Sequence, residues 1–492
     1  MTHRIAIIGA GMGGLAAALK LSGRPGLQIT LFEAADHPGG KVGVAHYEGV
    51  HFDTGPSLLT LPTIAADLFA DRGFDLADEL PLVKPDPIAR YHFPDGTSFQ
   101  VGENPQQTEE NIRTNLGSEA ALEFRSFLGY SRRIWEAAAP YFVMDKAPSV
   151  LTPLSMGISA IKAFRDIDST STMYDAICRR VADPRLRSVF LRYATFNGSD
   201  PRRAPATLNC ISWVDLGLGG HGVRGGMFEL AKTLERLARQ GGVEFQYDCP
   251  IRSITTNAGG FLLDCDGRQF EAHRVVVNAD VRHLVDDLWR EEVPKKLRST
   301  PPLSTSGWNA VLRARRRDRS RRVAHEIIFP DRDYLEEFVD LFDRDIPPKK
   351  PTIYLCAREK AHQASGWEEH EPLFLMTNVP ACDQGYSPVD WADYEDRIMT
   401  RLRSLDFIDH DDRVVWRRTP EHLARRFPGS QGSLYGAASN NRFAAFQRPS
   451  NSAPGIPGMY LASGSAHPGG GVPLCIQSGR QAGRELLEDI GL

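Results

Sequence analysis

The chain opens with a short apolar run that a glycine-rich turn interrupts. Ile5 to Ile8 is continuously apolar, which predicts a buried parallel strand, and the alanine- and leucine-rich stretch from Leu15 to Leu21 predicts a helix. A second stretch, Gln28 to Phe32, predicts another strand. The order strand, glycine turn, helix, strand is typical of the start of a Rossmann-type unit.

The middle of the chain follows a helical rather than a strand period. Charged and apolar positions from Asn104 to Ala139 recur at helical spacing, and Ser149 to Phe164 continues with a nearly charge-free segment. These patterns predict a helical insertion. The apolar segment could enter a membrane interface or line an entrance for a lipid, although such a segment is more often a core helix.

Rossmann-type alternation returns after this insertion. An amphipathic helix carrying Leu230, Leu234 and Leu237 precedes a predicted strand from Val243 to Tyr247, and another strand follows at Arg274 to Val277. Near the C-terminus, Gly458 to Ser465 reads as a final strand and turn before a helix that begins around Val472 and Pro473. The nucleotide-binding unit is therefore expected to be discontinuous.

Composition limits the function classes. The 492 residues include 58 basic and 62 acidic side chains, a net charge of −4, so the chain lacks the excess positive charge that holds a polyanion. Nucleic acid is therefore excluded as the expected principal partner. The charge-free stretch Ile5 to Leu19 falls short of the roughly 20 residues that span a bilayer.

The seven cysteines are scattered and never form a CxxC pair, which fits neither a disulfide framework nor a zinc site and favours a reducing cytosol. A run of seven arginines lies between Arg313 and Arg322. Such a run is usually a solvated loop, with docking on anionic lipid as the alternative.

The glycine turn has the spacing that a dinucleotide requires. Gly9 permits the tight turn, Gly11 lets the backbone approach a pyrophosphate, and Gly14 allows the helix to pack closely on the strand. Gly13 lies in the same turn. Glu33, at the end of the second strand, is placed to accept hydrogen bonds from ribose hydroxyls. These residues predict a bound FAD or NAD.

The next residues favour flavin. Gly39 and Gly40 form a second glycine pair where an NAD domain would usually enter another helix. This extended pattern resembles the flavoproteins of the amine oxidase and carotenoid desaturase type. The resemblance implies that Gly40 passes close to the FAD phosphates, that Lys41 occupies the usual basic position, and that the segment with Gly55 and Pro56 lies near the flavin.

The C-terminal signature narrows the family. His467 to Pro473 reads as a glycine-rich turn that opens a helix, where backbone amides could approach the flavin ring and the helix N-terminus would favour negative charge. With the N-terminal motif, this resembles the bacterial phytoene desaturase family over nearly the whole chain. Arg192 to Thr195 looks closer to the 1-hydroxycarotenoid 3,4-desaturase branch. The resemblance adds Ile251, Ser463, Gly464, Gly470, Gly471 and Val472 as expected cofactor contacts.

The predicted fold is α/β, with a discontinuous Rossmann-type FAD-binding domain, a mixed α+β substrate domain and a helical insertion that could face a membrane. The FAD-binding domain is assigned to residues 1–75, 220–290 and 445–492, the substrate domain to 76–105 and 291–444, and the helical insertion to 106–219.

The resemblance implies an FAD-dependent desaturase that takes a hydride from an acyclic carotenoid, with 1-hydroxycarotenoid 3,4-desaturation favoured over phytoene desaturation. A flavin oxidase or monooxygenase of carotenoid end groups or amines, and a non-catalytic carotenoid-binding flavoprotein, remain alternatives. His467 is the candidate acid–base residue, with a structural role in its turn equally open. No metal is expected, the electron acceptor is left between oxygen and quinone, and a cytoplasmic protein attached peripherally to the cytoplasmic membrane is expected.

Overall fold

Parallel strands from distant parts of the chain form one five-stranded sheet. The computed structural model describes residues 2–147, 166–298, 302–318, 321–382, 389–441 and 447–492. The sheet order is β19 (Met459–Leu461), β13 (Arg274–Val277), β1 (His3–Ile8), β2 (Leu27–Phe32) and β9 (Glu244–Gln246). All neighbours are parallel, with Ile5 beside both Ile29 and Arg274. The carboxyl ends of segments up to about 450 residues apart therefore meet at one edge.

Helices cover one face of this sheet and a small sheet covers the other. On the first face, α1 (Met12–Leu21) packs between α11 (Phe228–Gln240) and α18 (Val472–Asp489), and α2 (Pro62–Ala70) lies against α18. On the second face lies the antiparallel sheet of β10 (Ser253–Asn257), β11 (Gly260–Cys265) and β12 (Arg268–Ala272). Separate apolar clusters fill the two interfaces, which is what a sheet with apolar residues on both faces requires.

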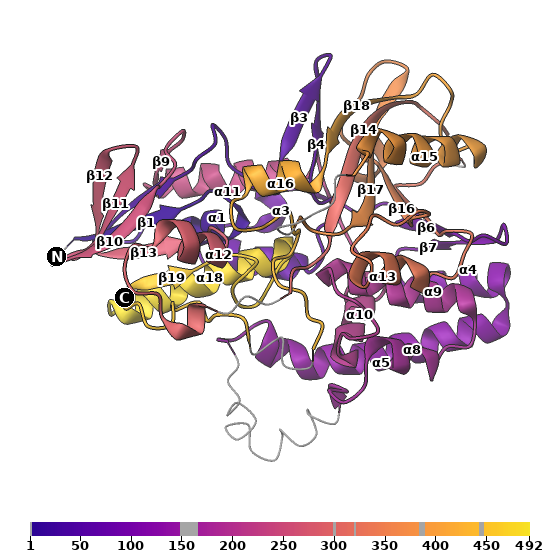
Figure 1. Ribbon diagram of the computed structural model, residues 1–492, viewed down its shortest axis with the longest axis horizontal. Coiled ribbons are helices and arrows are strands. Elements are labelled where there is room, and N and C mark those ends of the chain that lie inside the picture. Colours follow the sequence, from indigo (N-terminus) through magenta and orange to yellow (C-terminus); the bar gives the residue numbers. More distant parts are fainter. Residues whose placement is uncertain (1, 148–165, 299–301, 319–320, 383–388, 442–446) are drawn as a thin grey trace.

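A second, mostly antiparallel sheet lies beside the first (Figure 1). Its order is β18 (Arg413–Arg418), β14 (Ser306–Arg315), β17 (His370–Val379), β16 (Ile353–Ala357), β15 (His325–Ile328), β6 (Ala89–His92) and β7 (Ser98–Val101). Only the β15–β6 pair among these described strands is parallel. Helix α15 (Trp391–Ser404) covers one face through Tyr394, Ile398 and Leu402.

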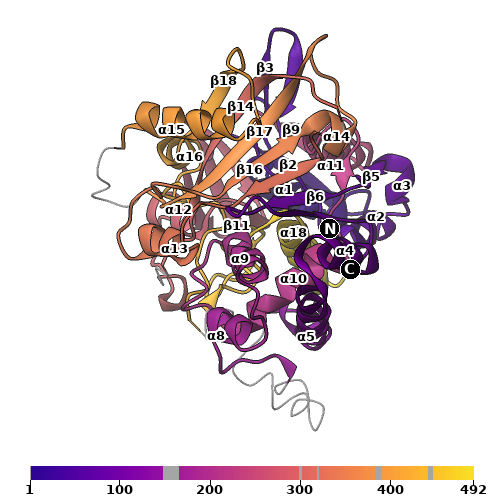
Figure 2. The same cartoon turned by 90° about the vertical axis from the view of Figure 1, so that its right-hand side faces the viewer.

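Helices from the middle of the chain pack below the β6–β7 end of this sheet, as Figure 2 shows from the side. They are α4 (Pro105–Leu116), α5 (Ser118–Phe142), α8 (Met173–Cys178), α9 (Pro184–Arg192), α10 (Cys210–Leu216) and α13 (Leu335–Phe342). The other described α-helices and strands are β3 (Val44–Tyr47), β4 (Val50–Asp53), α3 (Leu76–Glu79), β5 (Leu82–Val83), β8 (Gly222–Val223), α12 (Val281–His283), α14 (Arg358–His362) and α16 (Pro420–Arg426).

The architecture confirms the α/β class and a sheet assembled from distant segments. The predicted domain boundaries stay predictions. The apolar segment Ser149 to Phe164 lies outside the described residues. Within the described part of the chain, no helix combines the length and apolarity needed to cross a membrane.

The arginine run is only partly the solvated loop that its composition suggested: Arg315 and Arg321 are exposed, whereas other members form ion pairs within the fold. Arg316 pairs with Glu359 at 2.6 Å, Arg317 pairs with Asp409 at 2.9 Å, and the buried Arg322 pairs with Glu371 at 3.0 Å. Much of the charge is therefore neutralised within the fold, because the run begins in β14 and folds back over acidic neighbours. Cys249 and Cys265 also differ from expectation: they form a disulfide with a Cα–Cα distance of 5.8 Å.

Candidate functional site

The first glycine turn lies at the carboxyl end of β1 and is closely packed. Gly9 has a φ of +97°, which L side chains rarely adopt. A Cβ at Gly13 would overlap the carbonyl oxygen of Ala462, and one at Gly14 would overlap that of Gly9. At Gly11 a Cβ would lie 2.5 Å from Oδ1 of Asn278. The turn therefore needs glycine both for its own geometry and to approach the turns after β13 and β19.

Glu33 fixes this turn from the end of β2. Its Oε2 accepts the amide of Ala10 at 2.6 Å, and its Oε1 accepts the amide of Ala35 at 2.9 Å. The backbone carbonyl of Glu33 accepts the amide of Cys249 at 2.9 Å, which brings the segment with Ile251 to the same edge. Ile251 is itself 7% exposed. The predicted adenosine-side residues are thus neighbours.

The second glycine pair touches the first. The amide of Gly39 donates to the carbonyl of Ala10 at 2.8 Å, and a Cβ at Gly40 would lie 3.1 Å from Cα of Gly11. Lys41 follows, and its Nζ donates to the carbonyls of Ser433 and Leu434 at 2.8 and 3.0 Å. The two glycine loops, separate in sequence, therefore form one backbone-lined surface.

Gly55 continues this surface, because a Cβ there would overlap the carbonyl oxygen of Lys41. Pro56 follows and is half-buried. Asp53, just before them, was not singled out by the sequence argument. Its carboxylate accepts the amides of Met227 and Phe228 at 2.9 and 3.1 Å and so caps the start of α11. The motif that includes Gly55 and Pro56 thus also anchors the second Rossmann-type segment.

The C-terminal glycines meet the same edge. A Cβ at Gly464 would lie 3.2 Å from Cα of Gly470, and one at Gly470 would lie 2.7 Å from Cα of Tyr435. Ser463 and Ser465 share a hydrogen bond of 2.9 Å between their hydroxyls. Gly471, with a φ of +112°, precedes the first residue of α18, Val472. Backbone amides rather than side chains dominate this part of the site.

His467 is held inside its turn. It is 2% exposed, and its Nε2 lies 2.9 Å from the carbonyl oxygen of Asp145, so the proton resides on Nε2. Burial lowers the pKa of His467 to about 4. These contacts favour the structural role over the acid–base role, because the ring has almost no surface for a substrate to reach.

Two buried cations lie at this edge, and one of them, Arg448, lines a cavity of about 210 Å³ together with Gly436 and Ser465. Lys41 and Arg448 lie deep in the protein yet are only half-buried by surface area, and burial lowers the pKa of Lys41 and lowers that of Arg448 to about 10. Arg448 donates to the carbonyls of Pro468 and Ala437, both at 3.0 Å. Neither cation forms an ion pair with another described residue. The carboxylate of Asp280 acts on Lys41 from beyond ion-pair distance, whereas no described carboxylate acts on Arg448, and a buried positive charge without a counter-ion is costly. An anionic ligand therefore fits beside Arg448.

The backbone-lined surface and the two cations, Lys41 and Arg448, form a cradle at this edge of the sheet. This cradle fits a dinucleotide with a pyrophosphate. Gly9, Gly11, Gly13, Gly14 and Gly40 let these turns pack closely on one another at the N-terminus of α1, where the phosphates of a dinucleotide bind in a unit of this kind. The residues present therefore fit FAD. Arg448 was missed by the sequence argument because a single arginine beyond residue 446 carries no motif; only its depth identifies it.

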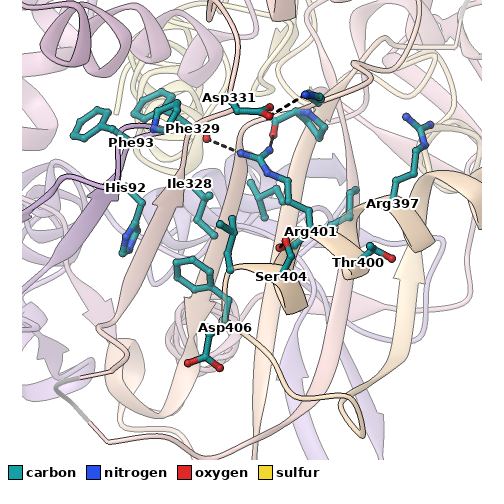
Figure 3. A pocket seen from close by; sticks show the side chains of 18 of the residues that line it. His92, Phe93, Ile328, Phe329, Asp331, Arg397, Thr400, Arg401, Ser404 and Asp406 are labelled. Atoms are coloured by element: carbon teal, nitrogen blue, oxygen red, sulfur yellow. Dashed lines mark hydrogen bonds and ion pairs between the residues drawn. The ribbon is translucent and has the colours of Figure 1, made fainter.

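A groove of about 820 Å³ lies on the face of the seven-stranded sheet that α15 covers (Figure 3). Arg401 donates to the carbonyl of Phe329 at 2.6 Å across its floor, and Asp331 pairs with Lys350 at 2.9 Å. Ile353 lines the groove, whereas its strand neighbour Tyr354 points to the opposite face. None of the predicted cofactor residues lines this groove, so the groove and the cradle are separate sites.

A third set of polar side chains borders interior space beyond the cradle. Arg192, Asp215, Tyr354 and Tyr435 are each half-buried by surface area but lie deep in the protein. Burial raises the pKa of Asp215 and of both tyrosines. Tyr435 connects this set to the cradle through its contact with Gly470.

The discontinuous parallel sheet, the paired glycine loops and the buried cations define a flavoprotein oxidoreductase fold. The sequence profile described as "Flavin containing amine oxidoreductase" matches residues 12–487. The chain belongs to this family, and its cofactor is FAD.

Full-length relatives narrow the position within the family. The chain is 32% identical to "Hydroxyneurosporene desaturase" of Rubrivivax gelatinosus, covering 99% of this chain and 93% of that protein. It is 30% identical to "1-hydroxycarotenoid 3,4-desaturase" of Flavobacterium sp. over 96% of this chain and 97% of the relative. A putrescine oxidase variant shares the fold with a TM-score of 0.63 at 15% identity, over 99% of each chain.

Proposed function

We propose that this protein is an FAD-dependent desaturase of acyclic carotenoids and that it favours 3,4-desaturation of a 1-hydroxylated end. The observation that carries the proposal is the end-to-end similarity to relatives named as desaturases of such carotenoids, 32% identity over 99% of the chain. The paired glycine loops and buried cations support it by providing a place for FAD.

The chain's own residues would hold the cofactor at its two ends. The turn of Gly11 and Gly13, with Gly40 packed against it, would bind the pyrophosphate at the N-terminus of α1, and Glu33 would accept hydrogen bonds from the adenosine ribose. Gly470, Gly471 and Val472, with Ser463 and Gly464 beside them, would present backbone amides to the flavin ring. When bound, FAD supplies the acceptor for a hydride taken from an allylic carbon of the substrate.

The protein would contribute binding, orientation and a dry interior. A carotenoid is almost wholly apolar, so its affinity would come from surface removed from water, at about 25 cal/mol per Å². Tyr354 and Met376 lie on the sheet face that looks away from α15, toward Phe52. His467 would hold the turn before α18 rather than move a proton.

Peripheral membrane association is proposed from the substrate class. A water-insoluble carotenoid resides in a membrane, and the apolar segment Ser149 to Phe164 in the sequence supplies one candidate contact. Internal ion pairing leaves the exposed Arg315 and Arg321 from the arginine run for an anionic surface. Flotation with neutral and with anionic liposomes tests this; no binding to either would contradict it.

The reaction is tested by supplying three substrates to the purified protein: phytoene, neurosporene and 1-hydroxyneurosporene. Each new conjugated double bond moves absorption to longer wavelength, so the spectrum reports desaturation. Conversion of 1-hydroxyneurosporene in preference to the others is expected. Conversion of phytoene alone would contradict the position of desaturation, and an oxygenated product would contradict the reaction class.

A further inference from the structure

A chain of hydroxyls leads to one carboxylate beside the interior space. The hydroxyls of Tyr91 and Tyr193 lie 3.2 Å apart, and that of Tyr193 donates to Oδ2 of Asp215 at 2.8 Å. The three residues come from β6, from the turn directly after α9, and from α10. Tyr91 and Tyr193 are 1% and 0% exposed, so their positions are fixed by packing.

Asp215 keeps one oxygen available. Tyr193 occupies Oδ2, whereas Oδ1 makes no hydrogen bond to any residue that the structure describes. Asp215 is half-buried by surface area although it lies deep in the protein. A side chain with both properties faces an interior space rather than bulk solvent. Oδ1 is thus an unused hydrogen-bond acceptor in a place that water reaches only through that space.

Arg192 lies beside this carboxylate without forming an ion pair with it. Its guanidinium carbon stands 5.1 Å from the ring centre of Phe196 and 5.9 Å from that of Tyr354. No described carboxylate lies within ion-pair distance of Arg192. Asp215 and Arg192 therefore bring an acceptor and a donor near each other without pairing them.

This polar pair is an anomaly in a site for a hydrocarbon. A buried polar atom without a hydrogen-bond partner costs on the order of 1–3 kcal/mol, so an apolar ligand alone would leave Oδ1 of Asp215 without the kind of partner that Oδ2 has in Tyr193. A ligand that carries a single hydroxyl could satisfy both groups, because a hydroxyl both donates and accepts.

The pair also lies toward the flavin end of the site. Arg192 acts electrostatically on Tyr354 and on Tyr435, and Tyr435 contacts Gly470 in the turn expected to face the flavin ring. In a 1-hydroxylated carotenoid only two bonds separate the hydroxyl-bearing carbon from the 3,4 position. A hydroxyl subsite for that reaction must therefore lie close to the reacting carbons.

We propose that Asp215 and Arg192 form the specificity subsite for a hydroxyl group at the end of the carotenoid. This proposal rests on the proposed function. The substrate hydroxyl donates to Oδ1 of Asp215 and accepts a hydrogen bond from the guanidinium of Arg192. Tyr193, with Tyr91 behind it, is a positioning residue that directs the carboxylate into the space.

The test compares Asp215→Leu, Asp215→Asn and wild type on 1-hydroxyneurosporene and on neurosporene, which lacks the hydroxyl. Asp215→Leu is expected to lower kcat/KM for the hydroxylated substrate by about tenfold to hundredfold, mostly through KM, and to leave that for neurosporene within about twofold. Asp215→Asn retains an oxygen acceptor and is expected to keep part of the preference. Asp396→Leu, an exposed carboxylate on α15, is the matched control and should change neither value.

Flavin content and thermal midpoint establish that each variant is folded. An equal fall in kcat for both substrates in Asp215→Leu would overturn the proposal, because it would place the carboxylate in the chemical step; an unchanged preference would overturn it as well. Binding of the two carotenoids, followed by quenching of tryptophan fluorescence, separates this proposal from the proposed function. If wild type binds both carotenoids and converts neither, the function fails, while the binding preference still decides the role of Asp215.

Discussion

Asp53 and Arg358 form a buried ion pair, with 3.0 Å between Oδ2 and Nη2 and side chains only 6% and 3% exposed. The pair joins β4, beside the cofactor segments, to α14 at the end of a strand of the seven-stranded sheet. The same carboxylate caps α11 through Met227 and Phe228. One side chain therefore fixes the relation between the two sheets and the helix that packs on α1.

Replacing Arg358 with methionine is expected to lower the free energy of unfolding by about 3–5 kcal/mol, because Asp53 would keep a buried charge without its partner. Urea unfolding measures this. Arg4→Met removes an exposed pair with Glu271, whose side chains are 46% and 58% exposed, and should cost under about 1 kcal/mol. Equal effects of the two variants would contradict the assigned importance of the buried pair.

Gly13→Ala is expected to prevent FAD retention, since its Cβ would overlap the carbonyl oxygen of Ala462, a backbone atom that cannot move away easily. Flavin absorbance per protein after desalting reports the loss. Gly129→Ala, in the helix α5, is the control: its Cβ would meet nothing closer than 3.9 Å. Retention of FAD by Gly13→Ala would show that the turn can shift.

Glu33→Ala and Lys41→Met are expected to weaken FAD binding by different routes. Glu33→Ala removes the carboxylate that accepts two backbone amides and holds the glycine turn. Lys41→Met removes a buried positive charge. Titration of the stripped protein with FAD should give a Kd about tenfold higher or more in each case. An unchanged Kd in Lys41→Met would remove Lys41 from the cofactor site.

Stability is expected to fall on acidification through buried histidines. Burial lowers the pKa of His362 and of His467 to about 4, against about 6.5 in the unfolded chain. The unfolded state binds more protons between these values, so their contribution is complete above about pH 6.5 and is lost as the pH falls toward 4. Each histidine should lower the free energy of unfolding by about 1–2 kcal/mol between pH 7 and pH 5.

Urea unfolding at pH 7 and pH 5 measures this dependence. His362→Asn keeps an acceptor for the amide of Val223 and should show a smaller loss between the two pH values than wild type. The exposed His410→Asn should match wild type. The same loss in His362→Asn as in wild type would contradict the assignment.

The sequence predicted those parts of the site that consist of backbone. Gly9, Gly11 and Gly14 carry a local spacing, so their place at the end of β1 followed from the pattern alone. Gly40 and Gly470 were predicted as cofactor contacts only because the sequence resembles the phytoene desaturase family. Neither route could show that Gly40 touches Gly11, because that contact depends on how distant segments assemble.

The sequence did not predict side chains whose role depends on contacts between distant parts of the chain. Arg358 lies 305 positions beyond Asp53, and Arg448 has no motif around it. The arginine run shows the opposite error: its composition suggested a solvated loop, but Arg322 is 1% exposed and pairs with Glu371. Charge density in a sequence does not report which acidic residues the fold will bring beside it.

During desaturation, electrons should pass from the acyclic carotenoid to FAD bound in this cradle. Anaerobic mixing of the yellow, FAD-loaded protein with 1-hydroxyneurosporene tests it in a single cuvette. Flavin absorbance is expected to bleach while carotenoid absorption shifts to longer wavelength, with one flavin reduced for each double bond formed. A carotenoid that binds without any bleaching of the flavin, and without any shift even after air is admitted, would contradict it.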